Sequence, residues 1–145
     1  MSEYIVDASV VIQRLIRDTH TEYAKALFRQ LKVADILHVP EHCLIECANV
    51  LWKQVRFHGM AQEDAESLIG DLVGLPLNIL PVTGLLKQAL QIGLAYQLAV
   101  YDSMYIALAG RLLYPLITVD MRQEAAAKAV GVTIKPITDF SPSIN

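Results

Sequence analysis

The sequence predicts an α/β protein in which one parallel β-sheet is covered by helices on both faces. Short apolar segments recur along the chain and alternate with longer segments whose apolar residues fall at helical spacing, which is the pattern of successive β–α units. No internal repeat, linker or low-complexity stretch interrupts this alternation. At 145 residues the chain has the length of one domain with one core, so we expect residues 1–145 to form a single domain.

The predicted strands are short and rich in aliphatic and β-branched residues. The first begins at Tyr4 and ends at Asp7, and Pro40 stops the second. The clearest late strand contains no charge until it ends at Asp120. The five predicted strands are Tyr4–Val6, Ile36–Val39, Leu77–Leu80, Leu116–Val119 and Val132–Lys135.

The predicted helices lie between these strands and before the last one. The longest, Glu41–Phe57, has one apolar stripe, whereas Glu46, Asn49, Lys53 and Arg56 occupy a different face at steps of three, four and three residues. Gly and Pro residues separate several of the helices from the next element. The predicted helices are residues 9–17, Glu22–Lys32, Glu41–Phe57, Gln62–Val73, Gly84–Tyr96, 100–113 and Met121–Val130.

The composition limits the class of protein. The chain is 54% hydrophobic with a mean hydropathy of +0.38, which indicates a sheet buried on both faces or an apolar subunit interface. No apolar run approaches the roughly 18 residues of a membrane span, and the N-terminus has no basic leader followed by an apolar core, so we expect a cytoplasmic protein without a membrane partner. The net charge of −3 excludes a bulk polyanion binder, so nucleic-acid contact would need a local basic patch or metal ions.

Four carboxylates are predicted to meet at one edge of the sheet. Asp7 and Asp120 each end a strand, and Glu46 and Asp102 lie near the starts of helices, which in this topology face the same edge. Converging carboxylates repel one another, and divalent cations relieve that repulsion. Hard oxygen ligands favour Mg²⁺ or Mn²⁺ over Zn²⁺. An acidic site of this kind is suited to the cleavage of phosphodiester bonds, because the metal activates water and stabilises the leaving oxygen.

Each carboxylate also has an ordinary structural explanation. Asp7, Asp102 and Asp120 can cap the helices that follow them, and Gln123, three residues after Asp120, fits a variant of the capping box. Glu46 can lie on a solvated helix face. Cys43 and Cys47 are one helical turn apart with no second cysteine pair, so we expect two buried thiols rather than a metal site.

The sequence resembles the PIN-domain ribonucleases, especially the toxin subunits of VapBC-type toxin–antitoxin modules. Four short motifs occur in the family's order and extend over nearly the whole chain. They are Val6-Asp7-Ala8-Ser9-Val10, Glu46-Cys47-Ala48-Asn49-Val50-Leu51, Tyr101-Asp102-Ser103-Met104-Tyr105-Ile106-Ala107-Leu108-Ala109 and Ile117-Thr118-Val119-Asp120. Ala8 departs from the hydroxyl residue that many members have after the first Asp, although the set of acidic residues is complete.

The resemblance implies a PIN-like domain with a five-stranded parallel sheet and an Mg²⁺- or Mn²⁺-dependent endoribonuclease activity, in which metal-activated water leaves 5′-phosphate and 3′-hydroxyl ends. It implies Asp7, Glu46 and Asp102 as the main catalytic and metal-binding acids, with Asp120 as a more variable fourth. Its partners would be RNA, a second copy in a homodimer and a cognate antitoxin near residues 22–73. Ser9, Thr118 and Asn49 would support the metal site, and Lys53, Arg56 and Arg14 are candidates for phosphate contact, with Arg17 and Arg122 as further ones.

Other interpretations remain open at this stage. A PIN domain that only binds RNA or a protein would be expected to lack some of the acids. A haloacid-dehalogenase-like phosphatase requires a second Asp where Ser9 stands, and a response-regulator receiver requires paired acids at the first strand. A zinc site from His38, His42 and Cys43 lacks a fourth ligand. For Trp52 and the tyrosines we expect packing in the core or in an interface rather than stacking on bases.

Overall fold

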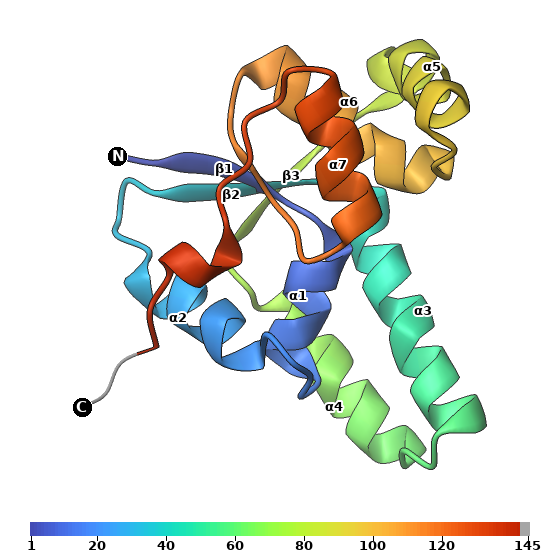
Figure 1. Cartoon of the computed structure of the whole chain (residues 1–145). Helices are drawn as coiled ribbons and strands as arrows, with labels where there is room; N and C mark the ends of the chain where they lie inside the picture. Colours follow the sequence, from blue (N-terminus) through green and yellow to red (C-terminus); the bar gives the residue numbers. More distant parts are fainter. Residues whose placement is uncertain (143–145) are drawn as a thin grey trace.

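A twisted sheet of four parallel strands forms the centre of the molecule. The computed structural model describes residues 1–142, and its strands lie in the order β3-β2-β1-β4 (Figure 1). The central strand β1 pairs in parallel with β2 on one side and with β4 on the other. The strands are β1 (Glu3–Val6), β2 (Ile36–Pro40), β3 (Leu77–Leu80) and β4 (Leu116–Ile117).

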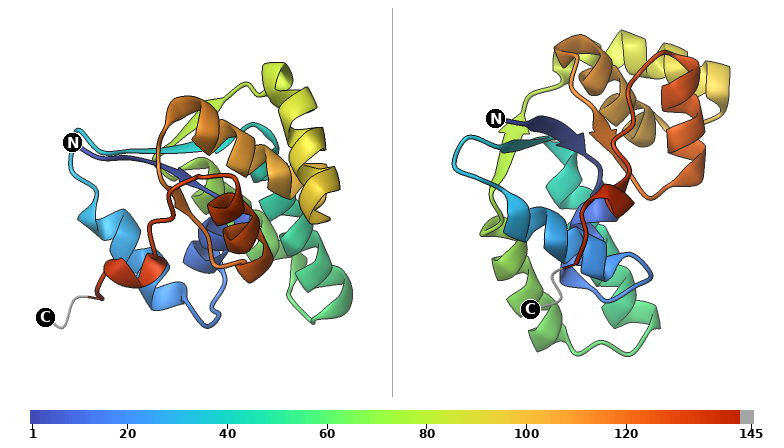
Figure 2. Two further views of the ribbon diagram at one scale, coloured as in Figure 1. Left: turned by 45° about the horizontal axis from the view of Figure 1, so that its top comes forward. Right: turned by 60° about the vertical axis from the view of Figure 1, so that its left-hand side comes forward.

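Helices cover both faces of this sheet, as the alternating sequence pattern predicts. One group, α1 to α4, lies on one side of the sheet, and α5 to α7 lie on the other (Figures 1 and 2). The predicted fold class is therefore confirmed. The helices are α1 (Ala8–Leu15), α2 (Thr21–Gln30), α3 (His42–Phe57), α4 (Gln62–Val73), α5 (Leu86–Tyr96), α6 (Val100–Leu112) and α7 (Met121–Ala129), with short 3₁₀ turns η1 (Thr83–Leu85) and η2 (Ile137–Asp139).

The predicted fifth strand, Val132–Lys135, is reduced to a single bridge. Ile134 forms an isolated parallel bridge with Leu116, where the Leu116 N–H donates to the Thr133 carbonyl at 2.8 Å and the Lys135 N–H to the Leu116 carbonyl at 2.9 Å. The strand cannot extend further because its neighbour β4 ends after Ile117, where the backbone begins to bond to side chains instead of to another strand. The sheet therefore has four strands and one bridge instead of five strands.

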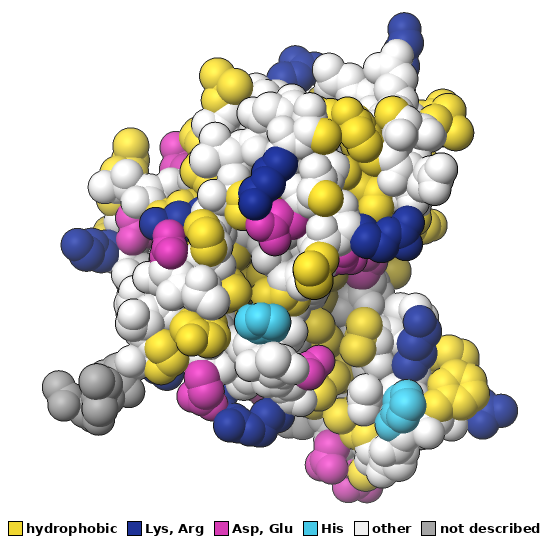
Figure 3. Space-filling view, viewed as in Figure 1, with side chains coloured by type: hydrophobic (Ala, Val, Ile, Leu, Met, Phe, Trp, Pro, Cys, Tyr) yellow, Lys and Arg dark blue, Asp and Glu magenta, His cyan; other side chains and the backbone are white. Residues whose placement is uncertain are grey.

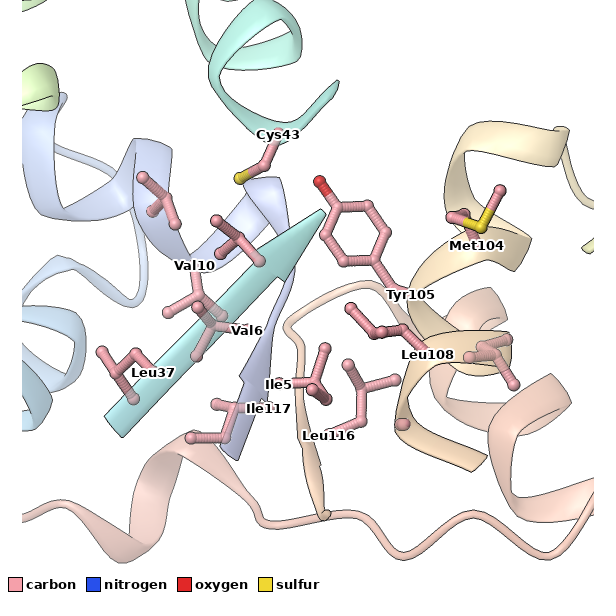
Figure 4. Close-up of a cluster of buried hydrophobic side chains, with 14 of the residues drawn as sticks. Ile5, Val6, Val10, Leu37, Cys43, Met104, Tyr105, Leu108, Leu116 and Ile117 are labelled. Atoms are coloured by element: carbon pink, nitrogen blue, oxygen red, sulfur yellow. The ribbon is translucent and has the colours of Figure 1, made fainter. Parts of the chain in front are cut away.

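The core lies between the central strands and the helices on either side. Ile5 is in register with Leu116 and Val6 with Ile117, and all four side chains are fully buried. Helix α6 packs on β1, β2 and β4, and its segment Ser103–Ala109 is buried (Figure 4). Cys43 and Cys47 are buried free thiols in α3, as predicted. An apolar strand that ends in a carboxylate thus leads directly from this core to Asp7.

Among residues 1–142, no helix alone combines the length and the apolar composition that a membrane span requires. The segments Thr83–Tyr96 and Val100–Leu112 pass that test only as a pair, with a bend of 116° between them, and on length and composition alone.

The contact between α5 and α6 depends on the absence of a side chain at Gly93. This glycine is buried, and a Cβ atom built on it would lie 2.7 Å from the carbonyl oxygen of Leu98 and 3.2 Å from Oγ of Ser103. The same turn contains Gln97, whose backbone has a φ of 58° and ends α5 in the left-handed conformation. The close approach brings the start of α6, and with it Asp102, to its position above the sheet edge.

We predict that Gly93→Ala destabilises the protein, because the new methyl group would contact a backbone carbonyl that has little freedom to move. The free energy of unfolding should fall by roughly 1–3 kcal/mol in urea titrations. Gly70→Ala is the matched control, because Gly70 lies inside α4 with no atom within 4 Å of its Cβ position. That substitution should raise the free energy of unfolding by about 0.5–1 kcal/mol through helix propensity alone. Equal effects of the two substitutions would contradict the packing argument.

Candidate active site: an acidic pocket at the strand ends

The four predicted carboxylates line one pocket, although they come from four different parts of the chain. The pocket has a volume of about 710 Å³. In the view of Figure 3, acidic side chains are seen in a hollow between α3 and the α5–α7 part of the molecule. The lining residues are Asp7, Ala8, Ser9, Ile12, His42, Ile45, Glu46, Asn49, Val50, Lys53, Tyr101, Asp102, Tyr105 and Asp120.

Asp7 lies in the lining of this pocket, at the point where β1 ends and α1 begins. Its Oδ1 accepts hydrogen bonds from Ser9 Oγ at 2.6 Å and from the Val10 N–H at 3.3 Å, and the latter caps α1. Its Oδ2 accepts a hydrogen bond from Thr118 Oγ1 at 2.8 Å. The side chain is only 4% exposed, so both of its oxygens depend on protein donors. Asp7 therefore caps a helix and also belongs to the pocket.

The two hydroxyl groups that donate to Asp7 also accept hydrogen bonds from backbone N–H groups of the segment after β4. Ser9 Oγ accepts a hydrogen bond from the Val119 N–H at 3.2 Å, and Thr118 Oγ1 accepts one from the Asp120 N–H at 3.0 Å. These bonds replace a sheet ladder beyond Ile117 and turn the chain so that Asp120 enters the pocket. The positions of Ser9 and Thr118, for which the sequence resemblance implied a supporting role, thus connect Asp7 to Asp120.

The first turn of α7 connects Asp120 to the start of α6. Asp120 Oδ1 accepts hydrogen bonds from the N–H groups of Arg122 and Gln123 at 2.9 and 3.1 Å, which caps α7. Gln123 is 1% exposed, and its Nε2 donates to the Asp102 carbonyl at 2.9 Å. Arg122 donates to the Gln97 carbonyl at 2.6 Å. The distance between Asp120 and Asp102 is therefore fixed by contacts between α7 and α6.

Asp102 does not cap its helix, contrary to the simplest structural explanation for its position. The residue before α6 is Ala99, and Asp102 already lies in the first turn of the helix. Its side chain is half-buried and lines the pocket. Helix capping therefore does not explain this carboxylate.

Glu46 is held by two aromatic side chains. The buried hydroxyl group of Tyr105 donates to Glu46 Oε1 at 2.7 Å, across 59 positions of sequence. His42, one turn earlier in α3, places its Nε2 3.3 Å from the same oxygen. Burial raises the pKa of Tyr105 well above its usual range, so the hydroxyl keeps its proton and acts as a donor. Figure 4 shows the Tyr105 hydroxyl directed towards α3 from the core side.

Burial makes three of the carboxylates hold protons more tightly than exposed ones. Desolvation raises the pKa of Asp7 to about 7, although Ser9, Thr118 and the Val10 N–H act in the opposite direction. Desolvation also raises the pKa of Glu46, with a further contribution from the negative charge of Asp102. For Asp102, desolvation and then the charge of Asp120 raise the pKa. The pocket thus carries an electrostatic cost whenever all of its acids are ionised.

The donor set is chemically suited to Mg²⁺ or Mn²⁺, since it consists of carboxylate oxygens with hydroxyl groups behind them and no thiolate among them. Among residues 1–142, however, no three His, Cys, Asp or Glu side chains lie close enough to hold a metal ion as they are arranged. Each of Asp7, Glu46 and Asp120 is hydrogen-bonded to protein groups instead. Coordination by three of these acids would therefore require their side chains to move closer together. Within residues 1–142, His38, His42 and Cys43 do not form a group that could hold zinc, and the His38 ring is hydrogen-bonded to Glu3 and Asn78.

The predicted basic contacts are separated by the fold. Lys53 and Asn49 line the pocket, and Lys53 is the one Lys or Arg among its lining residues in the described part of the chain. The guanidinium of Arg56 lies 5.1 Å from the ring centroid of Phe57, at the far end of α3. That of Arg14 lies 6.0 Å from the ring centroid of Phe28 and faces a different depression. The position of Arg56, ten residues after Glu46, places it about 15 Å farther along the helix axis.

Three pocket residues with polar side-chain groups were not predicted from the sequence as part of the acidic site. They are His42, Tyr101 and Tyr105. Tyr105 follows Asp102 by three positions and His42 precedes Glu46 by four, so each shares a helix face with an acid, which is a local signal in the sequence. The hydrogen bond between Tyr105 and Glu46 is set by the packing of α6 beside α3 and has no sequence signature of its own.

Comparisons with known proteins identify the family. The sequence profile of the PIN domain matches residues 4–129. The chain belongs to the PIN domain family. This confirms the resemblance carried by the four motifs, and the haloacid-dehalogenase and receiver alternatives are wrong.

Related proteins match this chain over most of its length, and solved structures share its fold. This PIN domain is 29% identical over 118 residues to the "Ribonuclease VapC3" of Pyrobaculum aerophilum, which covers 80% of this chain and 88% of that one. The crystal structure of PAE2754 from Pyrobaculum aerophilum superposes with a TM-score of 0.72 at 20% identity, over 95% of this chain and 91% of that one. Mycobacterium tuberculosis VapC20, described as a "Sarcin-Ricin loop cleaving toxin", gives a TM-score of 0.66 at 16% identity. The match covers 85% of this chain and 94% of that one. At these identities the two structures establish the fold.

We predict that the metal-free protein loses stability as the pH rises, because of Asp7. The pKa of Asp7 is about 7 in the folded chain and 3.8 for an ordinary aspartate, so the folded state binds the proton more tightly than the unfolded state. The stabilisation is fully present below the unfolded pKa and is lost as the pH rises through the folded one. Between about pH 5 and about pH 8 the free energy of unfolding in EDTA should fall by roughly 3 kcal/mol from this group.

Asp7→Asn should remove most of that slope in the same urea titrations, because the amide is uncharged at every pH. Asp71→Asn is the control, since Asp71 is an exposed acid on α4. A pH slope that is the same in wild type and Asp7→Asn would show that Asp7 ionises without cost and that the burial argument is wrong.

Proposed function

We propose that this PIN domain is a metal-dependent endoribonuclease, that it cleaves RNA phosphodiester bonds, and that it is the toxin of a toxin–antitoxin pair. The observation that carries the proposal is the convergence of Asp7, Glu46, Asp102 and Asp120 on one pocket of a PIN domain. The names of the related proteins support it, since one is a ribonuclease and another a toxin. A PIN domain used only for binding would have no need to bury carboxylates at an electrostatic cost.

In this proposal the four carboxylates hold one or two Mg²⁺ or Mn²⁺ ions. When bound, the ion supplies Lewis-acid activation of the attacking water and charge stabilisation of the leaving oxygen. The chain's own contribution is to present the oxygens. Ser9 and Thr118 orient Asp7, and Tyr105 and His42 orient Glu46. Asp120 keeps its place through the N–H groups of α7.

Contact with the phosphate backbone falls to Lys53 in this proposal. It lies on the same face of α3 as Glu46 and Asn49, and an ammonium group beside the pocket would attract the phosphate that flanks the cleaved bond. A single basic residue at the pocket also suits a net charge of −3, because the bound cations rather than a basic surface would offset the charge of the RNA.

The proposed protein partners are a cognate antitoxin and a second copy of the chain. A groove between α3 and α4 has a mainly apolar lining and an exposed Trp52, which suits an apolar antitoxin segment. It lies within the range of residues 22–73 that the sequence resemblance implied for the antitoxin. For the homodimer, the exposed leucines of α5 form one stripe at spacings of four residues, namely Leu86, Leu90 and Leu94.

The first test is cleavage of a mixed pool of single-stranded and structured RNA by purified, antitoxin-free protein. We expect cleavage with Mg²⁺ or Mn²⁺ and none with EDTA. Asp7→Asn and Asp102→Asn should each lower the cleavage rate by more than about a hundredfold, because each removes a charged ligand at nearly constant shape. Circular dichroism should show that both variants remain folded.

Asp71→Asn, which changes an exposed carboxylate on α4, should cleave at the wild-type rate. Wild-type activity in Asp7→Asn or in Asp102→Asn would contradict the assignment of the site. A folded wild-type protein that cleaves nothing in a broad pool would instead indicate a domain that only binds RNA or a partner.

We also expect Mg²⁺ to stabilise the wild-type protein. Bound cations relieve the repulsion among the buried carboxylates, and binding to the folded state alone adds roughly 2–3 kcal/mol once free metal is about a hundred times Kd. Thermal unfolding with Mg²⁺ and with Na⁺ at matched ionic strength measures this effect without reference to activity. Asp7→Asn should show a much smaller shift in Tm. Equal shifts in wild type and variant would place the bound metal elsewhere.

A further inference from the structure

A series of three aromatic rings runs from the core to the rim of the acidic pocket. Tyr105 is 1% exposed, and its ring centroid lies 5.2 Å from that of His42 at an interplanar angle of 68°. The His42 ring in turn lies 5.7 Å from the ring of Tyr101 at 57°. Both spacings fall in the range of favourable aromatic pairs. The series ends at Tyr101, whose side chain is 64% exposed.

The position of Tyr101 is fixed relative to the carboxylates. It lies in the first turn of α6, directly before Asp102, and its carbonyl accepts a hydrogen bond from His42 Nε2 at 3.1 Å. His42 also contacts Glu46, so one imidazole connects the exposed ring to a carboxylate of the pocket. A tyrosine has only two side-chain torsions, so its immobilisation by a ligand costs little conformational entropy.

Apolar side chains stand among the acids in the lining of the pocket. Ile45, which is 72% exposed, lines the pocket, and so do Ile12 and Val50. The pocket therefore offers apolar surface as well as carboxylates, together with Lys53 on α3. A nucleotide has the complementary halves, a flat apolar base and a charged phosphate. The pocket volume of about 710 Å³ is large enough for a unit of this size.

We infer that Tyr101 is a specificity residue that stacks on an unpaired base beside the phosphodiester bond to be cleaved. This inference rests on the proposed ribonuclease function and assigns the side chain that binds a base beside the cleaved bond. In an A-form duplex both faces of each base are covered by neighbouring bases, so none is available to the ring. Stacking on an aromatic ring tolerates every base, so Tyr101 selects for strand state rather than for sequence.

The test compares wild type, Tyr101→Ala and Tyr101→Phe as full-length proteins. The probe is a fluorescein-labelled pool of single-stranded RNA, beside the same pool annealed to its complement. Binding is measured by fluorescence anisotropy with Ca²⁺, and cleavage under single-turnover conditions with Mg²⁺. Tyr101→Ala should weaken binding of the single strands by roughly 5- to 150-fold, whereas Tyr101→Phe, which keeps the ring, should stay within about twofold of wild type. Affinity for the duplex should not change.

Phe57→Ala is the matched control, because Phe57 is 61% exposed but lies at the other end of α3, outside the pocket lining. It should bind and cleave as the wild type does. The Tm shift with Mg²⁺ should be the same in Tyr101→Ala and wild type, because the ring binds the base and not the metal.

Three outcomes would overturn the inference, and they differ from one another. If wild type cleaves RNA and Tyr101→Ala binds single strands equally well, Tyr101 does not stack on a base, and the ribonuclease function stands. If Tyr101→Ala weakens the binding of single-stranded and duplex RNA alike and also changes the oligomeric mass in light scattering, the ring belongs to a protein interface. If wild type itself neither binds nor cleaves RNA, the proposed function fails, and the inference fails with it.

Discussion

The carboxylate of Asp7 is the point at which strands β1 and β4 are joined beyond their backbone pairing. Its two oxygens accept hydrogen bonds from Ser9 and Thr118, and those two hydroxyl groups accept the backbone N–H groups of Val119 and Asp120. The chain after β4 is therefore held by side chains that are themselves held by Asp7. The end of the sheet, the start of α1 and the start of α7 all depend on this one buried acid.

This arrangement conflicts with the preference of a carboxylate for water. Burial raises the pKa of Asp7 to about 7, and the ionised form is stabilised only by neutral donors. Glu46 and Asp102 are displaced in the same direction by burial and by neighbouring acids. Proteins retain such groups where the chemistry requires them. In the proposed function a bound cation would offset this cost, and the stability of the fold would then depend on metal binding.

A second consequence is that the pocket is assembled by helix packing as much as by the sheet. Glu46 depends on Tyr105 from α6, and Asp102 depends on Gln123 from α7. The start of α6 in turn depends on the close approach of α5 at Gly93. Residues remote from the chemistry thus determine the distances between the acids. The rings of Tyr105, His42 and Tyr101 are held by the same packing of α3 against α6.

The sequence alone was sufficient to predict the fold class and to predict that these four acids meet in one pocket. The fold class depends on local patterns, namely apolar strands that end in Asp7 and Asp120 and alternate with amphipathic helices. Such patterns involve residues close together in the chain and can therefore be recognised in the sequence. The order of the four motifs added the family. Burial of Cys43 and Cys47 followed from their helical spacing and apolar surroundings in the same way.

Only the tertiary structure decided what the acids bond to and which neighbours reach them. Tyr105 meets Glu46 across 59 residues and Thr118 meets Asp7 across 111, and no local pattern encodes contacts at such separations. The same holds for the reduction of the fifth strand to one bridge, which results from side-chain bonds at the end of β4. The tertiary structure also decided the positions of Arg14 and Arg56, which are positively charged like Lys53 but face other parts of the surface. Spacing along a chain determines the face of a helix, whereas the neighbour of that face is determined by how the helices pack.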